Sequence, residues 1–145
     1  MNLAIFEIEY DNCIVSTNKN LLDINTIHQY LSKESYWALC IPIATVQKAI
    51  DNSICFGMYK NNTQVGFARV ITDKATFGYL ADVFIVKEYR GIGLSKWLMH
   101  EIMNHPELQG FRGWMLGTKD AHGLYEKVGY TDLVNEKRWM EKFRV

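Results

Sequence analysis

The sequence is poor in proline and cysteine and has no excess of charge of either sign. It contains 2 prolines among 145 residues, and 48% of its residues are hydrophobic, which excludes a low-complexity disordered chain and a collagen-like chain. Lysine plus arginine and aspartate plus glutamate each number 16, so the formal net charge is zero. Nucleic-acid-binding proteins usually carry a basic excess or stripe, and electrostatic membrane tethers need clustered basic residues. We therefore expect neither nucleic acid nor membrane as a partner.

The cysteines also exclude several classes of protein. Cys13, Cys40 and Cys55 are odd in number and widely spaced, and no CxxC pair occurs, which argues against a disulfide framework and a zinc site. We expect buried, reduced thiols and no bound metal. No apolar run reaches the roughly 20 residues of a transmembrane helix. The first ten residues include Glu7 and Glu9 and do not resemble a secretory signal, so the expected location is the cytoplasm.

The chain length and the hydrophobic periodicity predict one α/β domain over residues 1–145. The expected order is strand, helix, helix, an antiparallel meander, helix, strand, helix and a terminal hairpin. This order predicts a mixed, mostly antiparallel sheet of about six or seven strands flanked by about four helices. The expected strands are 14–15, 54–59, 65–71, 77–86, 114–117, 130–134 and 138–143, and the expected helices begin near 23, 42, 91 and 120.

Two smaller expectations concern polar residues near these helices. Asp120 lies where it can cap the helix that ends before Gly129, so capping is its expected role. The alternative is an acid/base pair with His122, but residues two apart at a helix start face different directions. His100 and His105 are expected on a solvated face, without the spacing of metal ligands.

One segment of the sequence indicates a ligand-binding site. Residues 83–95 predict a central strand, a short turn, and glycines Gly91 and Gly93 at the start of a helix. Helix N-termini present unpaired N–H donors, and glycines let a phosphate approach that backbone closely. Arg90 adds a fixed positive charge, so the segment predicts a pyrophosphate cradle, with a simple tight turn as the alternative. The segment does not supply the GxxxxGK[ST] pattern of a P-loop, and Lys96 stands where a dinucleotide fingerprint has its third glycine.

Two segments resemble signatures of the GCN5-related N-acetyltransferases (GNAT). Residues 90–95, RGIGLS, resemble the acyl-CoA-binding motif Q/R-x-x-G-x-G/A, with Ser95 in place of the final glycine or alanine. Residues 121–130, AHGLYEKVGY, resemble the family's second signature, A-x-x-L/F-Y-x-K-x-G-F/Y. The two occur in the family's order, about 30 residues apart. The resemblance covers the chain from roughly Ile14 onward.

The resemblance implies an acetyl-CoA-dependent N-acetyltransferase whose acceptor amine attacks the thioester directly. Dimers are common in this family, so a homodimer is one oligomeric state that it allows. The alternative is a catalytically inactive module that binds or senses acyl-CoA. By the same resemblance, the backbone of Phe84, Ile85 and Val86 would hold the pantetheine, and the pyrophosphate would lie on Arg90, Gly91, Ile92, Gly93, Leu94 and Ser95.

The catalytic candidates are Tyr125 and Asp82. Tyr125 matches the tyrosine of the second signature, which implies a general acid for the leaving thiolate, whereas its alternative role is packing against the sheet. Asp82 is the only acid in an apolar strand, which makes it a candidate general base or a structural carboxylate. Tyr36 and Trp37 lie where the family builds the acceptor wall, although core packing also explains them. Residues 139–141 are expected to edge the acceptor site or to pack as a strand.

Overall fold

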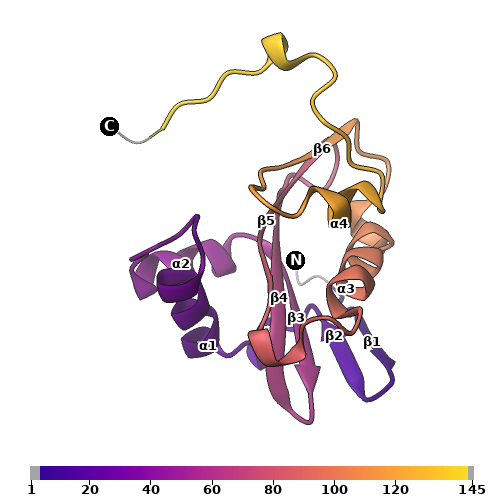
Figure 1. Ribbon diagram of the computed structural model, residues 1–145. Helices are drawn as coiled ribbons and strands as arrows, with labels where there is room; N and C mark the ends of the chain where they lie inside the picture. Colours follow the sequence, from indigo (N-terminus) through magenta and orange to yellow (C-terminus); the bar gives the residue numbers. More distant parts are fainter. Residues whose placement is uncertain (1–3, 144–145) are drawn as a thin grey trace.

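A six-stranded sheet runs through the domain in simple chain order, from β1 to β6. The structure, a computed structural model, describes residues 4–143. Neighbouring strands are antiparallel except β5 and β6, which are parallel (Figure 1). The strands are β1 (Glu7–Tyr10), β2 (Cys13–Ser16), β3 (Ile54–Lys60), β4 (Thr63–Thr72), β5 (Phe77–Ile85) and β6 (Gly113–Leu116).

Four α-helices cover the two faces of this sheet (Figure 1). The pair α1 and α2 lies on one face, and α3 and α4 lie on the other. Their bounds are α1 (Ile24–Gln29), α2 (Ile43–Asp51), α3 (Leu94–Met103) and α4 (His122–Glu126), and α1 continues into one π-helical turn, Tyr30–Glu34. Within residues 4–143, no helix is both long enough and apolar enough to cross a membrane. The mixed sheet with helices on both faces confirms the expected α/β class.

Side-chain alternation along the inner strands builds two cores. In β3, Phe56 packs toward α3 and α4, whereas its neighbour Cys55 packs toward α1 and α2. In β4, Ala68 and Phe67 divide in the same way. Successive side chains of a strand point to opposite faces, so a strand that is apolar at every position must be covered on both sides. This is why the meander lies at the centre of the domain.

The turn between β3 and β4 follows from its two asparagines. Asn61 and Asn62 have φ values of 52° and 63°. A two-residue hairpin with both residues in the left-handed region matches the right-handed twist of the strands, and asparagine tolerates that region. The predicted turn is therefore present at the predicted residues.

A bulge in β5 shapes the edge that faces β6. Phe67 pairs with Phe84 and Arg69 pairs with Ala81, so β5 carries one extra residue opposite Ala68. Asp82 adopts a φ of 55° within this bulge. Bulges bend the strand and increase its twist. The pairing of β5 with β6 accordingly ends at Leu80, and the rest of β5 has a free edge.

The expected terminal hairpin is wrong. Residues 130–134 and 138–143 form no strand, and the chain beyond α4 leaves the body as an extended segment (Figure 1). The sheet instead gains a strand, β1, that the periodicity did not predict, because Glu7 and Glu9 interrupt its apolar pattern.

Three expectations about single side chains are also wrong. Asp120 does not cap α4, because the N-cap is Ala121 and no side chain caps it. Cys40 is exposed, whereas Cys13 and Cys55 are buried as expected. His105 is buried beside the rings of Phe6 and Phe56, because α3 ends at Met103 and the chain then turns back against the sheet.

The burial of His105 predicts a pH-dependent stability. Burial lowers the pKa of the His105 imidazole, and its Nδ1 accepts a hydrogen bond from the Glu107 N–H at 3.1 Å. The folded protein thus binds this proton less readily than the unfolded chain does. We expect this contribution to the free energy of unfolding to fall as pH drops below about 6.5, by about 1.4 kcal/mol per unit of lowered pKa. Thermal melts at pH 7.5 and 5.5 measure it.

Matched variants isolate the effect. His105→Asn keeps a side-chain acceptor for the Glu107 N–H but cannot be protonated, so its melting temperature is expected to fall less on acidification. His100→Asn changes an exposed histidine of α3 and should retain the wild-type pH dependence. Equal acid sensitivity in wild type and His105→Asn would contradict the assignment.

Candidate active site

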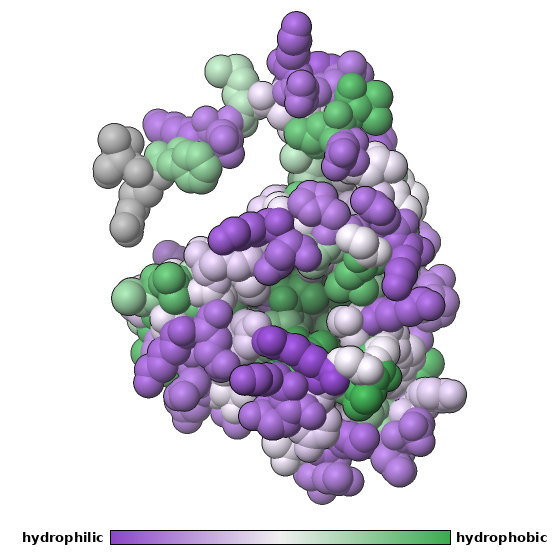
Figure 2. All heavy atoms as spheres, in the orientation of Figure 1, coloured by the Kyte–Doolittle hydropathy of each residue, from purple (hydrophilic) through white to green (hydrophobic). Residues whose placement is uncertain are grey.

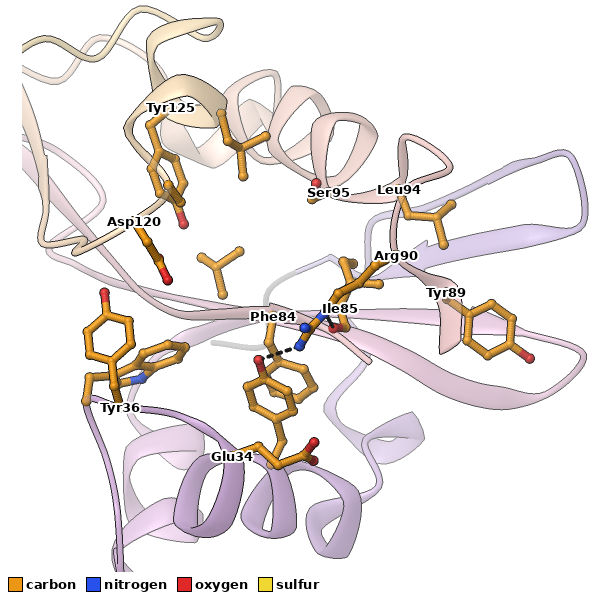
Figure 3. A pocket seen from close by; sticks show the side chains of 16 residues that line it. Glu34, Tyr36, Phe84, Ile85, Tyr89, Arg90, Leu94, Ser95, Asp120 and Tyr125 are labelled. Carbon is orange, nitrogen blue, oxygen red and sulfur yellow. Dashed lines mark hydrogen bonds between the residues drawn. The ribbon is translucent and has the colours of Figure 1, made fainter. Parts of the chain in front are cut away.

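A cavity of about 530 Å³ opens where β5 and β6 separate (Figure 3). It brings together the free edge of β5, the glycine turn before α3, the π-helical turn after α1, and the start of α4. The residues that line it are Tyr30, Glu34, Tyr36, Trp37, Val83, Phe84, Ile85, Tyr89, Arg90, Gly91, Leu94, Ser95, Asp120, Ala121, Leu124 and Tyr125.

The glycine turn has the conformation that a cradle requires. Gly91 and Gly93 have φ values of 79° and 87°, in the region that side chains rarely adopt. Nothing lies within 4 Å of a Cβ built at either glycine, so the backbone there is open to a ligand. Gly93 is the N-cap of α3, and no side chain caps the helix, which leaves its first N–H groups available. Ile92 and Gly93 lie beside the cavity rather than in its lining.

Arg90 crosses the cavity from the turn to the opposite wall (Figure 3). Its Nε donates to the Ile85 carbonyl at 2.9 Å, and a terminal nitrogen donates to the Tyr30 hydroxyl at 2.9 Å. The guanidinium also lies 5.9 Å from the centre of the Tyr30 ring. The arginine therefore puts a fixed positive charge at the end of the cavity formed by the glycine turn.

The three residues expected to hold the pantetheine, Phe84, Ile85 and Val86, differ in the availability of their backbone groups. Phe84 and Ile85 line the cavity, and the Phe84 ring stacks on Tyr30 with ring centres 4.0 Å apart. The Ile85 carbonyl already accepts from Arg90. Val86 lies outside the lining, and its N–H donates to the Val65 carbonyl at 2.8 Å, so that group is turned toward β4.

Tyr36 and Trp37 form a wall opposite α4. Their rings meet edge to face with centres 5.0 Å apart. The Tyr36 hydroxyl accepts a hydrogen bond from the Lys119 N–H at 2.6 Å, which ties this wall to the loop after β6. Both side chains remain more than 40% exposed, so they line an open space rather than the core.

Asp82 does not line the main cavity, and both of its oxygens are engaged. One accepts from the Trp37 indole N–H at 2.8 Å, and the other pairs with Arg69 Nε at 2.9 Å. The carboxylate lines a smaller adjoining space of about 150 Å³ that Tyr36, Trp37 and Tyr125 also line. A carboxylate held by two donors is better placed to position Trp37 than to take a proton, so the geometry favours the structural alternative.

Tyr125 is 8% exposed, and its hydroxyl points into the cavity (Figure 3). Among residues 4–143 this hydroxyl has no hydrogen-bond partner. Burial, with smaller contributions from Tyr36 and Asp120, raises the pKa of Tyr125 to about 12. The phenol therefore keeps its proton at neutral pH and can donate it or a hydrogen bond to a group in the cavity.

Asp120 is a residue of the cavity for which the sequence reasoning preferred another role. Its carboxylate points into the cavity beside Tyr125, at the end remote from Arg90 (Figure 3). Within the described part of the chain it makes no hydrogen bond and no ion pair. The local pattern suggested a cap, because aspartate before a helix usually is one. The signal for another role was the presence of two ionisable side chains, Asp120 and His122, at the start of the helix that carries Tyr125.

Comparison with known proteins agrees with this geometry. A model of the acetyltransferase (GNAT) domain matches residues 51–132. The chain belongs to the GNAT acetyltransferase family. A Gibberella zeae protein provisionally named an acetyltransferase is 36% identical over 136 residues, which cover 79% of this chain and 76% of that protein. The family resemblance is thereby confirmed, as is the transferase class that its members indicate.

Solved structures agree with the fold. A provisional GNAT-family acetyltransferase from Xanthomonas campestris pv. campestris is 52% identical, with a TM-score of 0.89 over 91% of this chain and 93% of that one. A GNAT-family acetyltransferase from Elizabethkingia anophelis, solved with acetyl-CoA bound, has a TM-score of 0.64 at 12% identity, over 94% of this chain and 90% of that one. At that identity the second likeness concerns the fold.

The contacts of Asp82 predict a coupling with Arg69. Asp82→Asn can keep the left-handed backbone but loses the ion pair, so we expect the free energy of unfolding to fall by about 1–3 kcal/mol. Combining it with Arg69→Met should give a coupling energy of about 1–2 kcal/mol in a double-mutant cycle measured by urea unfolding.

The control is Asp51→Asn, which removes an exposed carboxylate that accepts from Gln47, and should cost less than about 0.5 kcal/mol. A coupling energy near zero between Asp82 and Arg69 would contradict the structural role of Asp82. Asp82 would then again be a candidate for the general base.

Proposed function

We propose that this protein is an acetyl-CoA-dependent N-acetyltransferase acting on a primary amine of a small molecule or peptide. The observation that carries the proposal is the single cavity that joins a phosphate cradle at one end to a buried tyrosine and a free carboxylate at the other. A cofactor with a pyrophosphate and a long thioester arm matches that distribution of groups.

The cradle end suits the anionic half of acetyl-CoA. The N–H groups at the start of α3 and the Arg90 guanidinium favour phosphate oxygens. The free edge of β5 at Phe84 and Ile85 can hydrogen-bond the amides of the pantetheine in the manner of an added strand. For this to happen, Arg90 must release the Ile85 carbonyl, so its guanidinium would move from Tyr30 to the phosphates. Fold relatives with acetyl-CoA bound support this assignment.

The opposite end supports direct transfer to an amine. The neutral amine nitrogen attacks the thioester carbonyl, so a C–N bond forms and the C–S bond breaks. Asp120 attracts the incoming ammonium and takes one proton from it before attack. Tyr125 donates a proton to the leaving thiolate, and the second proton that the nitrogen loses as the amide forms returns to the Tyr125 oxygen. None of the three cysteines lines the cavity, which supports a path without a cysteinyl acyl-enzyme.

The charges around Tyr125 link the two roles. Burial is the main cause of its raised pKa, and the negative charge of Asp120 adds to it. An ammonium bound beside Asp120 offsets that charge and brings the pKa of the phenol closer to that of a thiol, near 8.5. The rings of Tyr36 and Trp37 can attract the same cation through their faces. These features favour an amine acceptor over a neutral alcohol.

A module that only senses acyl-CoA would need the cradle but neither Asp120 nor Tyr125. The two unpaired polar groups at the acceptor end therefore favour turnover over sensing. Release of free thiol from acetyl-CoA, followed with a panel of primary amines, separates the two. Binding of acetyl-CoA without thiol release on any amine would favour the sensing module.

The cradle predicts stabilisation by acetyl-CoA. A ligand that binds only the folded state at 100 times its Kd adds about 2.7 kcal/mol, or about 9 °C in Tm for a chain of this size. Gly93→Glu adds a bulky anion at the phosphate position, so it should abolish the shift. Thermal melts with and without acetyl-CoA measure both.

Gly110→Glu is the matched control, because Gly110 has a φ of 78° with nothing within 4 Å of a built Cβ and lies outside the cavity. It should carry a similar backbone strain and keep the acetyl-CoA shift. A folded Gly93→Glu protein that binds acetyl-CoA normally would put the cradle elsewhere.

The acceptor end predicts a split between kcat and KM. Tyr125→Phe removes one hydroxyl and should lower kcat by about 10²–10⁴ with little change in acetyl-CoA affinity. Asp120→Asn should raise KM for the amine by about tenfold or more. That loss should shrink as pH rises, because the neutral amine then accumulates without a base. Steady-state kinetics against pH measure both.

Tyr130→Phe and Glu126→Gln serve as controls, because both residues lie outside the cavity and close to α4. Both should keep wild-type kinetics. Wild-type turnover in folded Tyr125→Phe would remove Tyr125 from the chemistry, and an unchanged amine KM in Asp120→Asn would do the same for Asp120.

A further inference from the structure

A second cavity, of about 340 Å³, lies between α2 and the strands β4 and β5. Most of its lining is aliphatic or aromatic and includes Leu31, Ile41, Val46, Ala49, Ile50 and Phe67. Among the described residues, the charged side chains that line it are those of Arg69 and Asp82, which pair with each other at 2.9 Å. This apolar cavity therefore offers a ligand apolar surface and no unpaired charge.

The apolar cavity adjoins the candidate active site. Trp37 lines the apolar cavity, the main cavity of about 530 Å³ and the small space of about 150 Å³. Asp82 lines the small space and the apolar cavity, whereas Tyr125 and Asp120 line the small space and the main cavity. The small space therefore connects the two groups that would handle the amine with the apolar cavity. In the space-filling view, apolar atoms also lie in the depth of the hollow between the two helix pairs (Figure 2).

The loop that closes the apolar cavity on one side, residues 38–42, is fixed by hydrogen bonds. His28 Nε2 donates to the Ile41 carbonyl at 2.9 Å, and the Cys40 N–H donates to the Ser32 carbonyl at 3.0 Å. These bonds tie the loop to α1 and to the π-helical turn after it. The cavity is therefore preformed, as ligand pockets of about 300–1,000 Å³ usually are.

The volume and the lining select the occupant. An apolar cavity of about 150 Å³ is already large enough to hold benzene, so the apolar cavity here has room for an alkyl chain of about six carbons. Ala38, Ala49 and Ala81 contribute small side chains from the loop, α2 and β5, which leaves this space open. A charged group would lose its hydration there without gaining a partner, since Arg69 and Asp82 already neutralise each other.

We propose that the acceptor is a small monoamine with an unbranched apolar chain. Its ammonium lies beside Asp120 and Tyr125, and its chain passes Trp37 and enters the apolar cavity. The small volume of the connecting space suits an unbranched chain. This inference rests on the proposed acetyltransferase function and narrows the class of its acceptor. It excludes diamines, amino acids and amino sugars as good acceptors, because each would carry a second charged or strongly polar group into the apolar cavity.

A series of linear amines tests the chain. Ethylamine, butylamine and hexylamine have ammonium pKa values near that of lysine, about 10.4, so they differ in apolar length and not in the supply of neutral amine. We expect kcat/KM, followed as thiol release from acetyl-CoA, to rise about three- to fourfold per methylene. Pentane-1,5-diamine matches hexylamine in length but ends in a second ammonium, so its kcat/KM should be lower by at least about 10²-fold.

Two substitutions fill the apolar cavity from different elements. Ala49→Leu and Ala38→Leu should lower kcat/KM for hexylamine by about tenfold or more and leave that for ethylamine within about twofold. The shift in Tm caused by acetyl-CoA should stay unchanged in both, which shows that each variant folds. Ala44→Leu is the matched control, because Ala44 is an exposed alanine of α2 outside the cavity lining, and it should keep the wild-type preference.

Calorimetric titration with hexylamine separates this inference from the transferase function. Thiol release that is independent of chain length, or a hexylamine preference that both filled variants keep, would overturn the apolar acceptor and leave the transferase function standing. If no amine releases thiol, the transferase function is wrong. Hexylamine binding that Ala49→Leu weakens would then still identify the apolar cavity as a ligand site, whereas the absence of such binding would overturn both.

Discussion

The extra residue in β5 is the constraint on which the site depends. Because Asp82 occupies a bulge with φ of 55°, β5 bends and its hydrogen bonds to β6 end at Leu80. The gap that follows is the cavity, and the freed edge of β5 is its floor. A non-glycine residue in that conformation costs on the order of 1 kcal/mol, and the ion pair with Arg69 and the bond from Trp37 offset it. The same contacts fix the aromatic wall, so one backbone irregularity sets both the cofactor side and the acceptor side.

The cavity is also polarised along its length. Arg90 and the uncapped start of α3 contribute positive charge at one end, which Glu34 also lines, and Asp120 contributes negative charge at the other end (Figure 3). An anionic cofactor would therefore bind at one end of the cavity and a cationic amine at the other, and their reacting groups would meet beside Tyr125. Although the chain has a net charge of zero, its charge is sorted within the site, which is why overall composition gave no information about the acceptor.

The failure of the expected hairpin has a physical cause. The aromatic residues Trp139 and Phe143 are typical of strands, but a strand exists only where another strand supplies hydrogen bonds. Nothing in the sequence says whether that neighbour lies in the same chain. The prediction that His105 is solvated was wrong for a related reason. Helical periodicity put His105 on a polar face, whereas the chain after Met103 leaves the helix and turns inward against Phe56.

The sequence by itself determined the features that are written in a few adjacent residues. These are the asparagine turn at Asn61 and Asn62, the glycine turn before α3 and the buried meander, because each follows from local backbone preference or strict periodicity. Tyr125, in contrast, became a candidate only through the resemblance of residues 121–130 to the family's second signature. Only the tertiary structure showed what surrounds Asp82 and Asp120. Asp82 is bound by Trp37, 45 positions earlier, and Asp120 shares a cavity with residues from Tyr30 onward. Such surroundings depend on which distant side chains share one cavity, and that is fixed by packing rather than by spacing along the chain.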